Sequence, residues 1–509
     1  MRRVGRYGGV TATDPDDLDI LVVGGGVNGA GIARDAAGRG WRVLLAEAGD
    51  LAGATSSRSS KLIHGGLRYL EQYAFRLVRE SLQERETLLH SAPHLVTPLR
   101  FVLPHHDGLR PAWMLRAGLF LYDHIGGERS LPGTRTVDLR HDPAGAPLQE
   151  RFRRGFEYSD CWVDDARLVA LLAVDARERG AQVLTRTRVT SARREGGGWV
   201  AELEAQDGGR RQVRARALVN AAGPWVDKVL ASTGRNAPAG HHVRLVKGSH
   251  IVLPRLYEGA HCYTLQGGDG RVVFTIPYEG THTLVGTTDV PYDGDPAAVT
   301  PTGEEAEYLC TLLGDYFAQP VSPEAVTWSY AGVRPLADSG EANASAVTRD
   351  YVFDLEAPEG GAPSLSIFGG KLTTFRKLAE HALRDLGRAL GDARPAWTAS
   401  AAIPGGDLGP DGFDGLLARL SRERPWLPRP VLERLAHAYG SRTERVLGGA
   451  TGWAGLGRDF GGGLTEAELD HLRREEWAVT AEDVLWRRSK LGLHLSAAER
   501  DAVAQAMGA

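Results

Sequence analysis

The chain has 509 residues, of which 42% are hydrophobic, and a formal net charge of −4 at pH 7. This length favours two or three domains over one, and the small net charge excludes a general electrostatic attraction to nucleic acid. Cys161, Cys262 and Cys310 lie far apart, which argues against a disulfide framework or a metal cluster and fits a reducing cytoplasm. We expect a flexible tail at 1–17, no bound metal, and neither a signal peptide nor a membrane-spanning segment.

The first predicted unit is a strand, a turn, a helix and a second strand. Residues 20–23 and 43–46 are short apolar runs suited to buried parallel strands, and residues 30–39 are rich in helix formers. Between them the sequence reads GGGVNG. The pattern therefore predicts one βαβ unit built around a glycine turn.

This turn places Gly24, Gly26 and Gly29 at the spacing of a dinucleotide-binding fingerprint. Gly24 permits a tight turn, Gly26 lets the backbone approach a diphosphate, and Gly29 lets the helix pack closely on the strand. Glu47 follows the second strand, where its carboxylate would accept hydrogen bonds from ribose hydroxyls and would repel the 2′-phosphate of NADP. The unit is therefore a predicted nucleotide site that disfavours NADP.

The rest of the chain alternates between helical and strand-like patterns. Residues 76–91 predict a surface helix on which Val78 and Leu82 face inward while Glu80 and Glu84 face outward. Two capping boxes, at 480–483 and 496–499, mark helix starts near the C-terminus. In chain order we also expect a helix at 165–180, a meander at 181–189, 199–205 and 211–220, antiparallel strands at 250–254, 271–278 and 283–290, a strand, glycine turn and helix at 366–386, and a linker at 393–412.

The arrangement of these elements distinguishes FAD from NAD. After Glu47 the chain continues with AGDLAGATSSRSSKLIHGGLRYLE, a segment rich in hydroxyl groups that can reach a flavin, instead of the further βα units typical of an NAD domain. The nucleotide fold resumes only at ALVNAAGPW, more than 150 residues later, and ends at the late turn GGKLT. This split pattern resembles the FAD-binding fold of the amino-acid oxidase and glycerol-phosphate oxidase superfamily. The resemblance implies that the glycine turn holds the ADP half of FAD.

The implied fold is α/β, with a split Rossmann-like FAD-binding domain, an inserted, mainly antiparallel β substrate domain, and a C-terminal helical domain. The FAD-binding domain comprises 18–95, 161–235 and 336–392. A substrate or cap segment at 96–160 and the substrate domain at 236–335 interrupt it, and the linker at 393–412 leads to the helical domain at 413–509.

Six longer segments narrow the resemblance to the aerobic, FAD-dependent glycerol-3-phosphate dehydrogenases. That resemblance implies oxidation of sn-glycerol 3-phosphate to dihydroxyacetone phosphate by hydride transfer to N5 of FAD, with electrons passed to a membrane quinone. It further implies a homodimer on the inner, cytoplasmic face of the cell membrane. One departure is the N-terminal extension of 17 residues, which has no assigned role. The segments are ATSSRSSKLIHGGLRYLE (54–71), PAWMLRAGLFLYDH (111–124), VRLVKGSHIVLP (243–254), YAGVRPL (330–336), FGGKLTTFRKLAE (368–380) and DVLWRRSKLGLHL (483–495).

The resemblance also assigns roles to polar residues in these segments. It implies that His250 is the proton acceptor, which suits its near-neutral pKa, and that Arg334 contacts the substrate oxygen. The planar fork of an arginine suits a phosphate dianion. Structural alternatives remain open: His250 as a buried structural residue, Arg349 as the partner of Asp350, and Lys371 as a group that stabilises reduced flavin. The implied substrate-binding residues are Arg68, Tyr69, Arg349 and Lys371.

The resemblance also implies that a larger set of residues contacts FAD. Serine and threonine runs also occur in turns, so turn formation is the alternative for the hydroxyl segment. The implied FAD-binding residues are Gly24, Gly26, Val27, Asn28, Gly29, Glu47, Thr55, Ser56, Ser59, Lys61, His64, Val189, Ala222, Gly223, Gly369, Gly370, Lys371, Leu372 and Thr373.

A quinone is lipid-soluble, so a quinone-reducing enzyme must touch the bilayer, and we expect peripheral attachment. Residues 109–122 combine Trp113 and Phe120 with Arg110 and Arg116, and residues 483–495 show a weaker form of the same pattern. Packed core helices are the alternative for both segments. Two rival functions also remain: an oxidase that passes electrons to O₂, and a non-catalytic flavin-binding sensor at the membrane.

Overall fold

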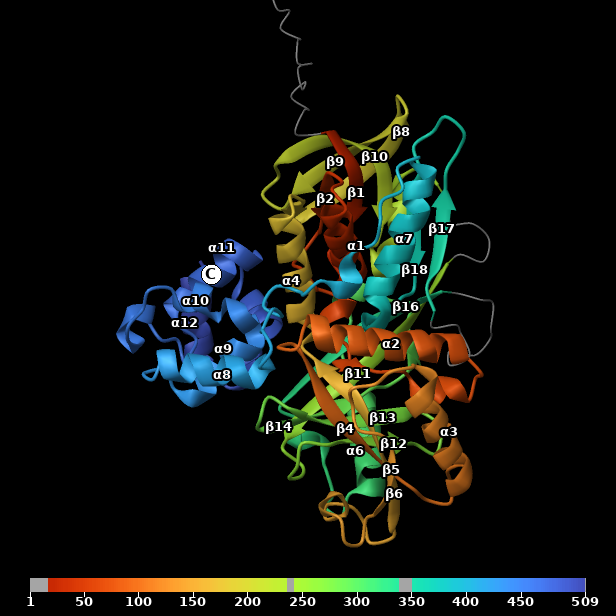
Figure 1. The fold of residues 1–509 in the computed structure, drawn as a ribbon, viewed down its shortest axis with the longest axis vertical. Coiled ribbons are helices and arrows are strands. Elements are labelled where there is room, and N and C mark those ends of the chain that lie inside the picture. The colour runs from red at the N-terminus through yellow and green to blue at the C-terminus, as the bar shows by residue number, and fades with distance from the viewer. Residues whose placement is uncertain (1–16, 236–241, 338–349, 509) are drawn as a thin grey trace, which may run out of the picture.

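The computed structural model describes residues 17–235, 242–337 and 350–508 (Figure 1). Two sheets lie one above the other along the long axis, and the C-terminal helices form a separate domain beside them (Figure 1). The predicted fold class is confirmed. The tail, apart from Asp17, and Arg349 lie outside the described residues.

The first sheet contains the nucleotide fold. Its central strand β1 (Asp17–Val23) pairs in parallel with β2 (Val43–Ala46) on one side and with β10 (Arg210–Asn220) on the other. Outside these, β7 (Gln182–Leu184) pairs with β2, β18 (Ser364–Phe368) pairs with β10, and β17 (Val352–Glu356) pairs with β18. The strand order is β17-β18-β10-β1-β2-β7, which brings the late strand–turn–helix segment beside the first βαβ unit.

The period-two alternation of β1 places its side chains on two different cores. Ile20 and Val22 belong to the core shared with α1 (Val27–Gly38), α4 (Asp165–Glu178) and α7 (Phe375–Ala389). Leu21 and Val23 face the meander of β8 (Thr187–Glu195), β9 (Gly198–Ala205) and β10, which covers the other face. The first strand predicted for this meander, at 181–189, is divided between β7, which pairs in parallel with β2, and the start of β8. Both faces of the sheet are therefore buried, as expected of parallel strands.

The second sheet is antiparallel apart from the pairing of β4 with β12. Helix α6 (Gly303–Tyr316), which begins with a capping box, shares one apolar core with this sheet. Helices α2 (Phe75–Ser91) and α3 (Ala112–Ile125) share another. The strands are β3 (Leu62–Ile63), β4 (Val96–Pro104), β5 (Arg135–Asp138), β6 (Arg154–Val163), β11 (Val243–Pro254), β12 (Cys262–Gln266), β13 (Val272–Tyr278), β14 (His282–Gly286), β15 (Val290–Pro291) and β16 (Trp328–Ala337).

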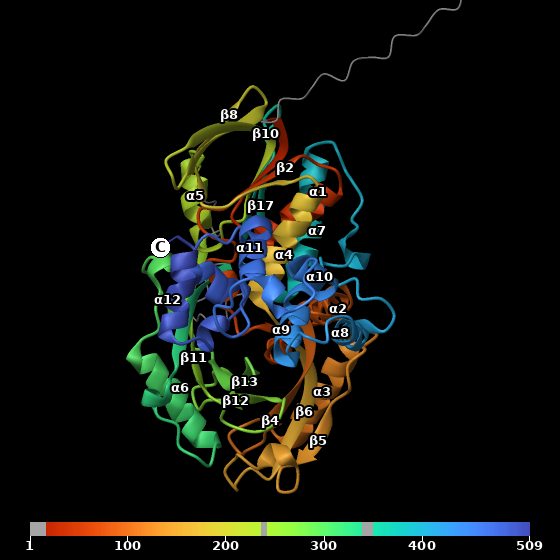
Figure 2. The same ribbon diagram turned by 90° about the vertical axis from the view of Figure 1, so that its left-hand side faces the viewer.

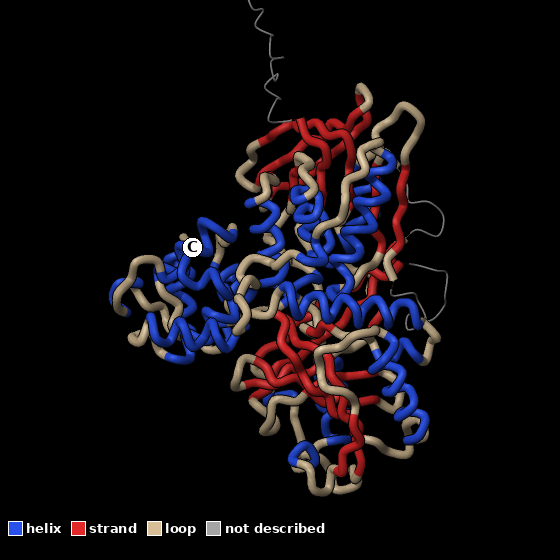
Figure 3. The backbone as a smooth tube through the Cα atoms, viewed as in Figure 1, coloured by secondary structure: helices blue, strands red, loops and turns tan. Residues whose placement is uncertain are grey.

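The C-terminal domain is built of helices and loops around its own core (Figures 2 and 3). Both predicted capping boxes are present, since Ser496 and Glu499 exchange hydrogen bonds, as do Thr480 and Asp483. Its helices are α8 (Gly412–Glu423), α9 (Arg429–Tyr439), α10 (Thr443–Leu447), α11 (Glu466–Glu476), a π-helical turn (Asp483–Arg488) and α12 (Ala497–Ala506).

One sequence expectation is wrong. Glu84 does not face outward: it is buried, and its carboxylate accepts a hydrogen bond from Nε of Arg376 at 2.8 Å. The predicted linker at 393–412 packs against the FAD-binding fold, because the indole of Trp397 donates to the backbone of α1 and Ile403 is buried. In both segments a partner distant in the sequence buries residues that the local pattern does not mark as buried.

The glycine turn gives a direct test of the fold. A Cβ at Gly29 would overlap the carbonyl oxygen of Gly24, so Gly29→Ala must push α1 away from β1. We expect this overpacking to lower the free energy of unfolding by about 3 kcal/mol, measured by urea denaturation. Gly314→Ala, in α6, is the control: a Cβ there meets nothing within 4 Å, and the change should be within about 1 kcal/mol. Equal effects of the two substitutions would contradict the close packing.

Candidate cofactor and substrate site

A cavity of about 1600 Å³ is lined by residues of both sheets and of the C-terminal domain. All the predicted site residues in the described part of the chain line this cavity, except Gly29 and Lys61. Those that line it are Gly24, Gly26, Val27, Asn28, Glu47, Thr55, Ser56, Ser59, His64, Arg68, Tyr69, Val189, Ala222, Gly223, His250, Arg334, Gly369, Gly370, Lys371, Leu372 and Thr373.

The glycine turn fits a dinucleotide diphosphate. Gly24 has φ +109°, and a Cβ there would lie 2.6 Å from the carbonyl oxygen of Ala221. Helix α1 starts at the cavity wall with Gly26 as its N-cap, and no side chain caps it. The N–H of Val27 donates to the hydroxyl of Ser56 at 3.0 Å. The positive end of the helix dipole therefore faces the cavity, as an anionic diphosphate requires.

Glu47 holds the turn together. Its carboxylate accepts hydrogen bonds from the backbone N–H of Gly25 at 2.6 Å and of Gly49 at 2.7 Å. Burial raises the pKa of Glu47, which these two hydrogen bonds oppose. The side chain lines the cavity, so its remaining lone pairs can still accept ribose hydroxyls. Glu47 thus has a structural role that its position in the sequence does not reveal.

The hydroxyl segment divides between the cavity and the protein interior. Ser56 lies at the start of α1, whereas Thr55 donates to the carbonyl oxygen of Val333 at 2.6 Å. Ser59 donates to Asp165 at 2.7 Å, and the ammonium of Lys61 lies 2.8 Å from the same carboxylate. The side chains of Lys61 and Asp165 are at most 1% exposed. Lys61 therefore supports the cavity wall from behind, without reaching the cofactor space.

His250 is held between two strands that flank β11. In register it lies beside Tyr330 of β16, whose ring stacks on the imidazole at 4.8 Å, and beside Gly286 of β14. A Cβ at Gly286 would collide with the imidazole, so this glycine makes the space for the ring. Nε2 lies 2.9 Å from the hydroxyl of Ser60.

The electrostatic setting of His250 keeps its ring neutral. The side chain is buried, and burial, helped by the cations of Lys61 and Arg334, lowers the pKa of His250 well below 6.5. Nδ1 is buried and has no hydrogen-bond partner among the described residues. A neutral imidazole in the cavity wall is able to accept a proton.

Arg334 lies on the adjacent strand. Its guanidinium donates to the carbonyl oxygen of Thr288 at 2.8 Å and lies 2.8 Å from the carboxylate of Asp289. Gly248, on β11 two residues from the position opposite Arg334, leaves space for it, since a Cβ there would lie 2.7 Å from the guanidinium. Because β11 and β16 are paired, Arg334 and His250 face one cavity from neighbouring strands.

A second basic group comes from segments far apart in the chain. The ammonium of Lys371, which follows the glycine pair at 369–370, lies 4.0 Å above the ring of Tyr69. Arg68, in the adjoining turn, also lines the cavity. Gly66 precedes this turn with φ +75°, and a Cβ there would overlap the Tyr69 ring. The structure thus brings the 66–69 and 369–371 turns to one wall.

The remaining predicted residues line other parts of the wall. The amide of Asn28 donates to the carbonyl oxygen of Gly369 at 3.3 Å, which ties the first glycine turn to the last. The N–H of His64 donates to Thr373 at 3.3 Å. Val189 on β8 and Gly223 after β10 lie on the meander side.

Sequence reasoning did not find the groups that position His250. Ser60 and Tyr330 were inside recognised segments, yet only the strand register shows that they contact the imidazole. Arg58, which lines the cavity and donates to the carbonyl oxygen of Ala331 at 3.0 Å, was also missed. Among the described residues, no cluster of three or more His, Cys, Asp or Glu is placed to hold a metal ion.

The nucleotide fold is split, and its glycine-lined cradle at the start of α1 opens into a basic pocket. This combination is typical of the class of FAD-dependent oxidoreductases. The chain belongs to the family described as FAD dependent oxidoreductase, whose model matches residues 19–375. Residues 396–509 match the C-terminal domain of alpha-glycerophosphate oxidase. FAD is therefore the cofactor, and the cradle described above fits it.

Relatives cover nearly the whole chain. It is 54% identical to the D-erythritol 1-phosphate dehydrogenase of Brucella abortus, over 96% of this chain and 97% of that protein. It is 54% identical to the glycerol-3-phosphate dehydrogenase of Pseudomonas aeruginosa (95% and 93% covered) and 51% identical to the aerobic glycerol-3-phosphate dehydrogenase of Escherichia coli (96% of each). The crystal structure of glycerol-3-phosphate dehydrogenase from Bacillus halodurans complexed with FAD has a TM-score of 0.74 at 27% identity, covering 96% of this chain and 94% of that one.

The hydrogen bonds of Glu47 can be tested through the cofactor. Glu47→Gln keeps the shape but removes the charge and one acceptor facing a backbone N–H, so the turn should lose order. Hydrogen bonds to a charged acceptor contribute about 1.5–3 kcal/mol, and we expect the Kd of the apoprotein for FAD to rise about ten-fold or more. Fluorescence titration measures this. Glu204→Gln, in another wall of the cavity, is the control and should change the Kd less than about two-fold. An unchanged Kd in Glu47→Gln would contradict the role of Glu47 in holding the glycine turn for FAD.

Proposed function

We propose that this chain oxidises sn-glycerol 3-phosphate to dihydroxyacetone phosphate and passes the electrons to a membrane quinone. The observation that carries the proposal is the gathering of Arg68, Lys371 and Arg334 with a neutral His250 around one cavity that also contains the FAD cradle. Cations from separate segments of the cavity wall suit a small substrate with a phosphate at one end and a reacting hydroxyl at the other. The names of the relatives support the same substrate class.

The reaction removes a hydride from C2 and a proton from its hydroxyl. When bound, FAD supplies the two-electron acceptor, at N5, for this hydride. The imidazole of His250, which its lowered pKa keeps neutral at physiological pH, accepts the hydroxyl proton. Arg334 donates to the substrate oxygen as negative charge develops on it. Arg68 and Lys371 bind the phosphate, and Tyr69 packs beneath the Lys371 ammonium.

Flavin reduction by a substrate panel tests the proposal. We would mix the holoenzyme with substrate without oxygen and follow the flavin absorbance by stopped flow. Glycerol 3-phosphate should bleach the flavin, while glycerol and amino acids should not, because they lack the phosphate. D-Erythritol 1-phosphate is included because a relative at 54% identity is named D-erythritol 1-phosphate dehydrogenase. Faster bleaching by this compound would make it the substrate in place of glycerol 3-phosphate. No bleaching by any of the compounds would favour the non-catalytic flavin-binding sensor.

An exposed apolar patch supports quinone as the acceptor. Tyr73 is 79% exposed, and on α3 Trp113 is 71% and Phe120 is 62% exposed, on the side of the molecule away from the C-terminal domain (Figure 1). Tyr73 and Met114 belong both to this patch and to the cavity wall. A patch of this kind marks an interaction surface, and here it adjoins the cavity mouth. A quinone would enter from the lipid directly toward the flavin.

Arginine side chains at the same place suit peripheral attachment to a membrane. The side chains of Arg76 and Arg110 are 82% and 53% exposed beside the patch, where they form ion pairs with Asp350 and Glu71. Aromatic rings flanked by arginines suit the headgroup layer. In the described part of the chain, no helix is both long and apolar enough to span a bilayer. The homodimer and the location on the cytoplasmic face of the cell membrane stay predictions from the resemblance.

Arg334→Ala should leave the flavin bound but lower turnover. Loss of a preorganised donor to the developing charge costs about 10²–10³-fold in kcat, and we expect a decrease of that size with glycerol 3-phosphate and a quinone analogue. Flavin content is read from absorbance in the same samples. Arg334→Lys keeps the charge and loses the planar fork, so its turnover should lie between that of Arg334→Ala and that of the unchanged chain. Near-normal turnover in Arg334→Ala would remove this residue from the site.

The double variant Trp113→Asp and Phe120→Asp tests the membrane surface. Burying each ring contributes about 1.5–3 kcal/mol, so vesicle partitioning should decrease at least ten-fold in co-sedimentation with vesicles that contain anionic lipid. Leu355→Asp, on the strand β17, is the matched control and should partition normally. Unchanged partitioning of the double variant would contradict the proposed surface.

The electron acceptor is tested separately. Rapid oxygen uptake by the unchanged enzyme with glycerol 3-phosphate and without quinone would support an oxidase in place of the quinone-linked dehydrogenase.

A further inference from the structure

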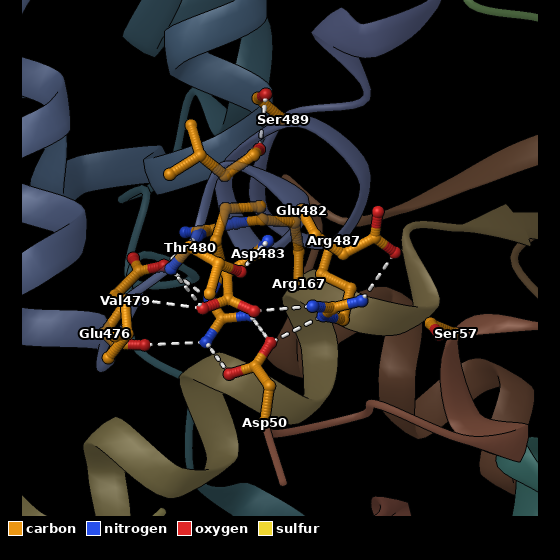
Figure 4. A network of polar contacts seen from close by, with 12 residues as sticks. Asp50, Ser57, Arg167, Glu476, Val479, Thr480, Glu482, Asp483, Arg487 and Ser489 are labelled. Atoms are coloured by element: carbon orange, nitrogen blue, oxygen red, sulfur yellow. Dashed lines mark hydrogen bonds and ion pairs between the residues drawn. The ribbon is translucent and has the colours of Figure 1, made fainter. Parts of the chain in front are cut away.

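The C-terminal domain reaches the FAD cavity through one short segment. The π-helical turn Asp483–Arg488 lies against α4 and the loop after β2 (Figure 4). Thr480, Asp483 and Arg487 are the members of this domain that line the cavity within the described residues. Neither the proposed chemistry nor the family match assigns this turn a role.

Its main contact is with Asp50. The carboxylate accepts hydrogen bonds from Nε of Arg487 at 2.6 Å and from two nitrogens of Arg488 at 2.7 and 2.8 Å. The side chain of Asp50 is 3% exposed and that of Arg488 is fully buried. Three charge-assisted hydrogen bonds in a buried place give one defined geometry, and removing either side leaves an uncompensated buried charge.

Asp50 lies at the centre of the loop that closes the dinucleotide cradle. This loop begins at Glu47, whose carboxylate binds the N–H of Gly25, and continues to Ala52, whose N–H donates to the carbonyl oxygen of Gly25 at 3.1 Å. Ala52 has φ 57°, an uncommon conformation for alanine that needs support from its surroundings. The carbonyl oxygen of Asp50 accepts from the N–H of Gly53. Holding Asp50 therefore holds the loop against the glycine turn.

The turn itself is fixed from two other directions. The carboxylate of Asp483 is bound by Arg186 of the FAD-binding domain at 2.6 Å and by the N–H groups of Val479 and Thr480. The ring of Trp486 stacks on Trp328, at the start of β16, with centroids 4.4 Å apart. The same turn therefore contacts the cofactor loop and the strand that carries Arg334.

We propose that Arg487 and Arg488 are positioning residues for FAD: by binding Asp50 they keep the loop 47–53 closed over the dinucleotide, so that cofactor retention depends on the C-terminal domain. The proposal concerns FAD alone and does not rest on the substrate.

The test compares FAD affinity with stability in the full-length apoprotein. Asp50→Asn and Arg487→Gln should each raise the Kd for FAD at least ten-fold in a fluorescence titration. Arg442→Gln is the matched control, because it breaks another contact between the C-terminal domain and α4, with Glu178 at 2.6 Å, outside the cavity wall. Its Kd should stay within two-fold of the unchanged chain. The thermal midpoint of each apoprotein is measured alongside.

Two results would overturn the proposal. The first is a Kd within two-fold of the unchanged chain in both Asp50→Asn and Arg487→Gln. The second is an equal increase of the Kd in Arg442→Gln, which would mean that any loosening of the contact between the C-terminal domain and α4 weakens FAD binding. Where Asp50→Asn fails to fold, Arg487→Lys gives the same test, since it keeps the charge but loses the Nε donor to Asp50, and it should show an intermediate Kd. Because no substrate is present, these results are independent of the proposed activity.

Discussion

The close approach of α1 to β1 at Gly24 and Gly29 is the contact on which the rest of the site depends. It fixes where the helix begins, and so where its first N–H groups and positive dipole end point. Two other parts of the cavity wall are joined to this point. The hydroxyl of Ser56 and the late turn at 369–371, through Asn28, are both bonded to the start of α1.

Strand register then brings His250 and Arg334 to the same cavity. His250 and Arg334 are four residues apart in register on neighbouring strands, because Val246 lies opposite Arg334 and His250 opposite Tyr330. Glycines at 248 and 286 leave room for the guanidinium and the imidazole, which are too large to share a sheet face with ordinary neighbours. A rigid antiparallel sheet therefore supplies positioning that a loop would not maintain.

Much of the fold follows from local patterns, whereas the pairing of buried charges does not. The βαβ unit, the meander, the late strand–turn–helix and both capping boxes were readable because each is set by residues a few positions apart. Glu84 with Arg376, Lys61 with Asp165, and Asp50 with Arg487 are separated by 292, 104 and 437 residues. No periodicity encodes such pairs. The local pattern therefore does not reveal that Lys61 and Glu84 each pair with an opposite charge far away in the chain.

The buried pair of Glu84 and Arg376 also joins two regions that the sequence keeps apart. Arg376 is in the first turn of α7, five residues after Lys371, and Glu84 lies near the middle of α2. The same helix α2 begins at Phe75 and Arg76, at the exposed aromatic surface. A helix of 17 residues spans about 25 Å. One rigid helix therefore connects the exposed aromatic surface to the start of α7, five residues after Lys371.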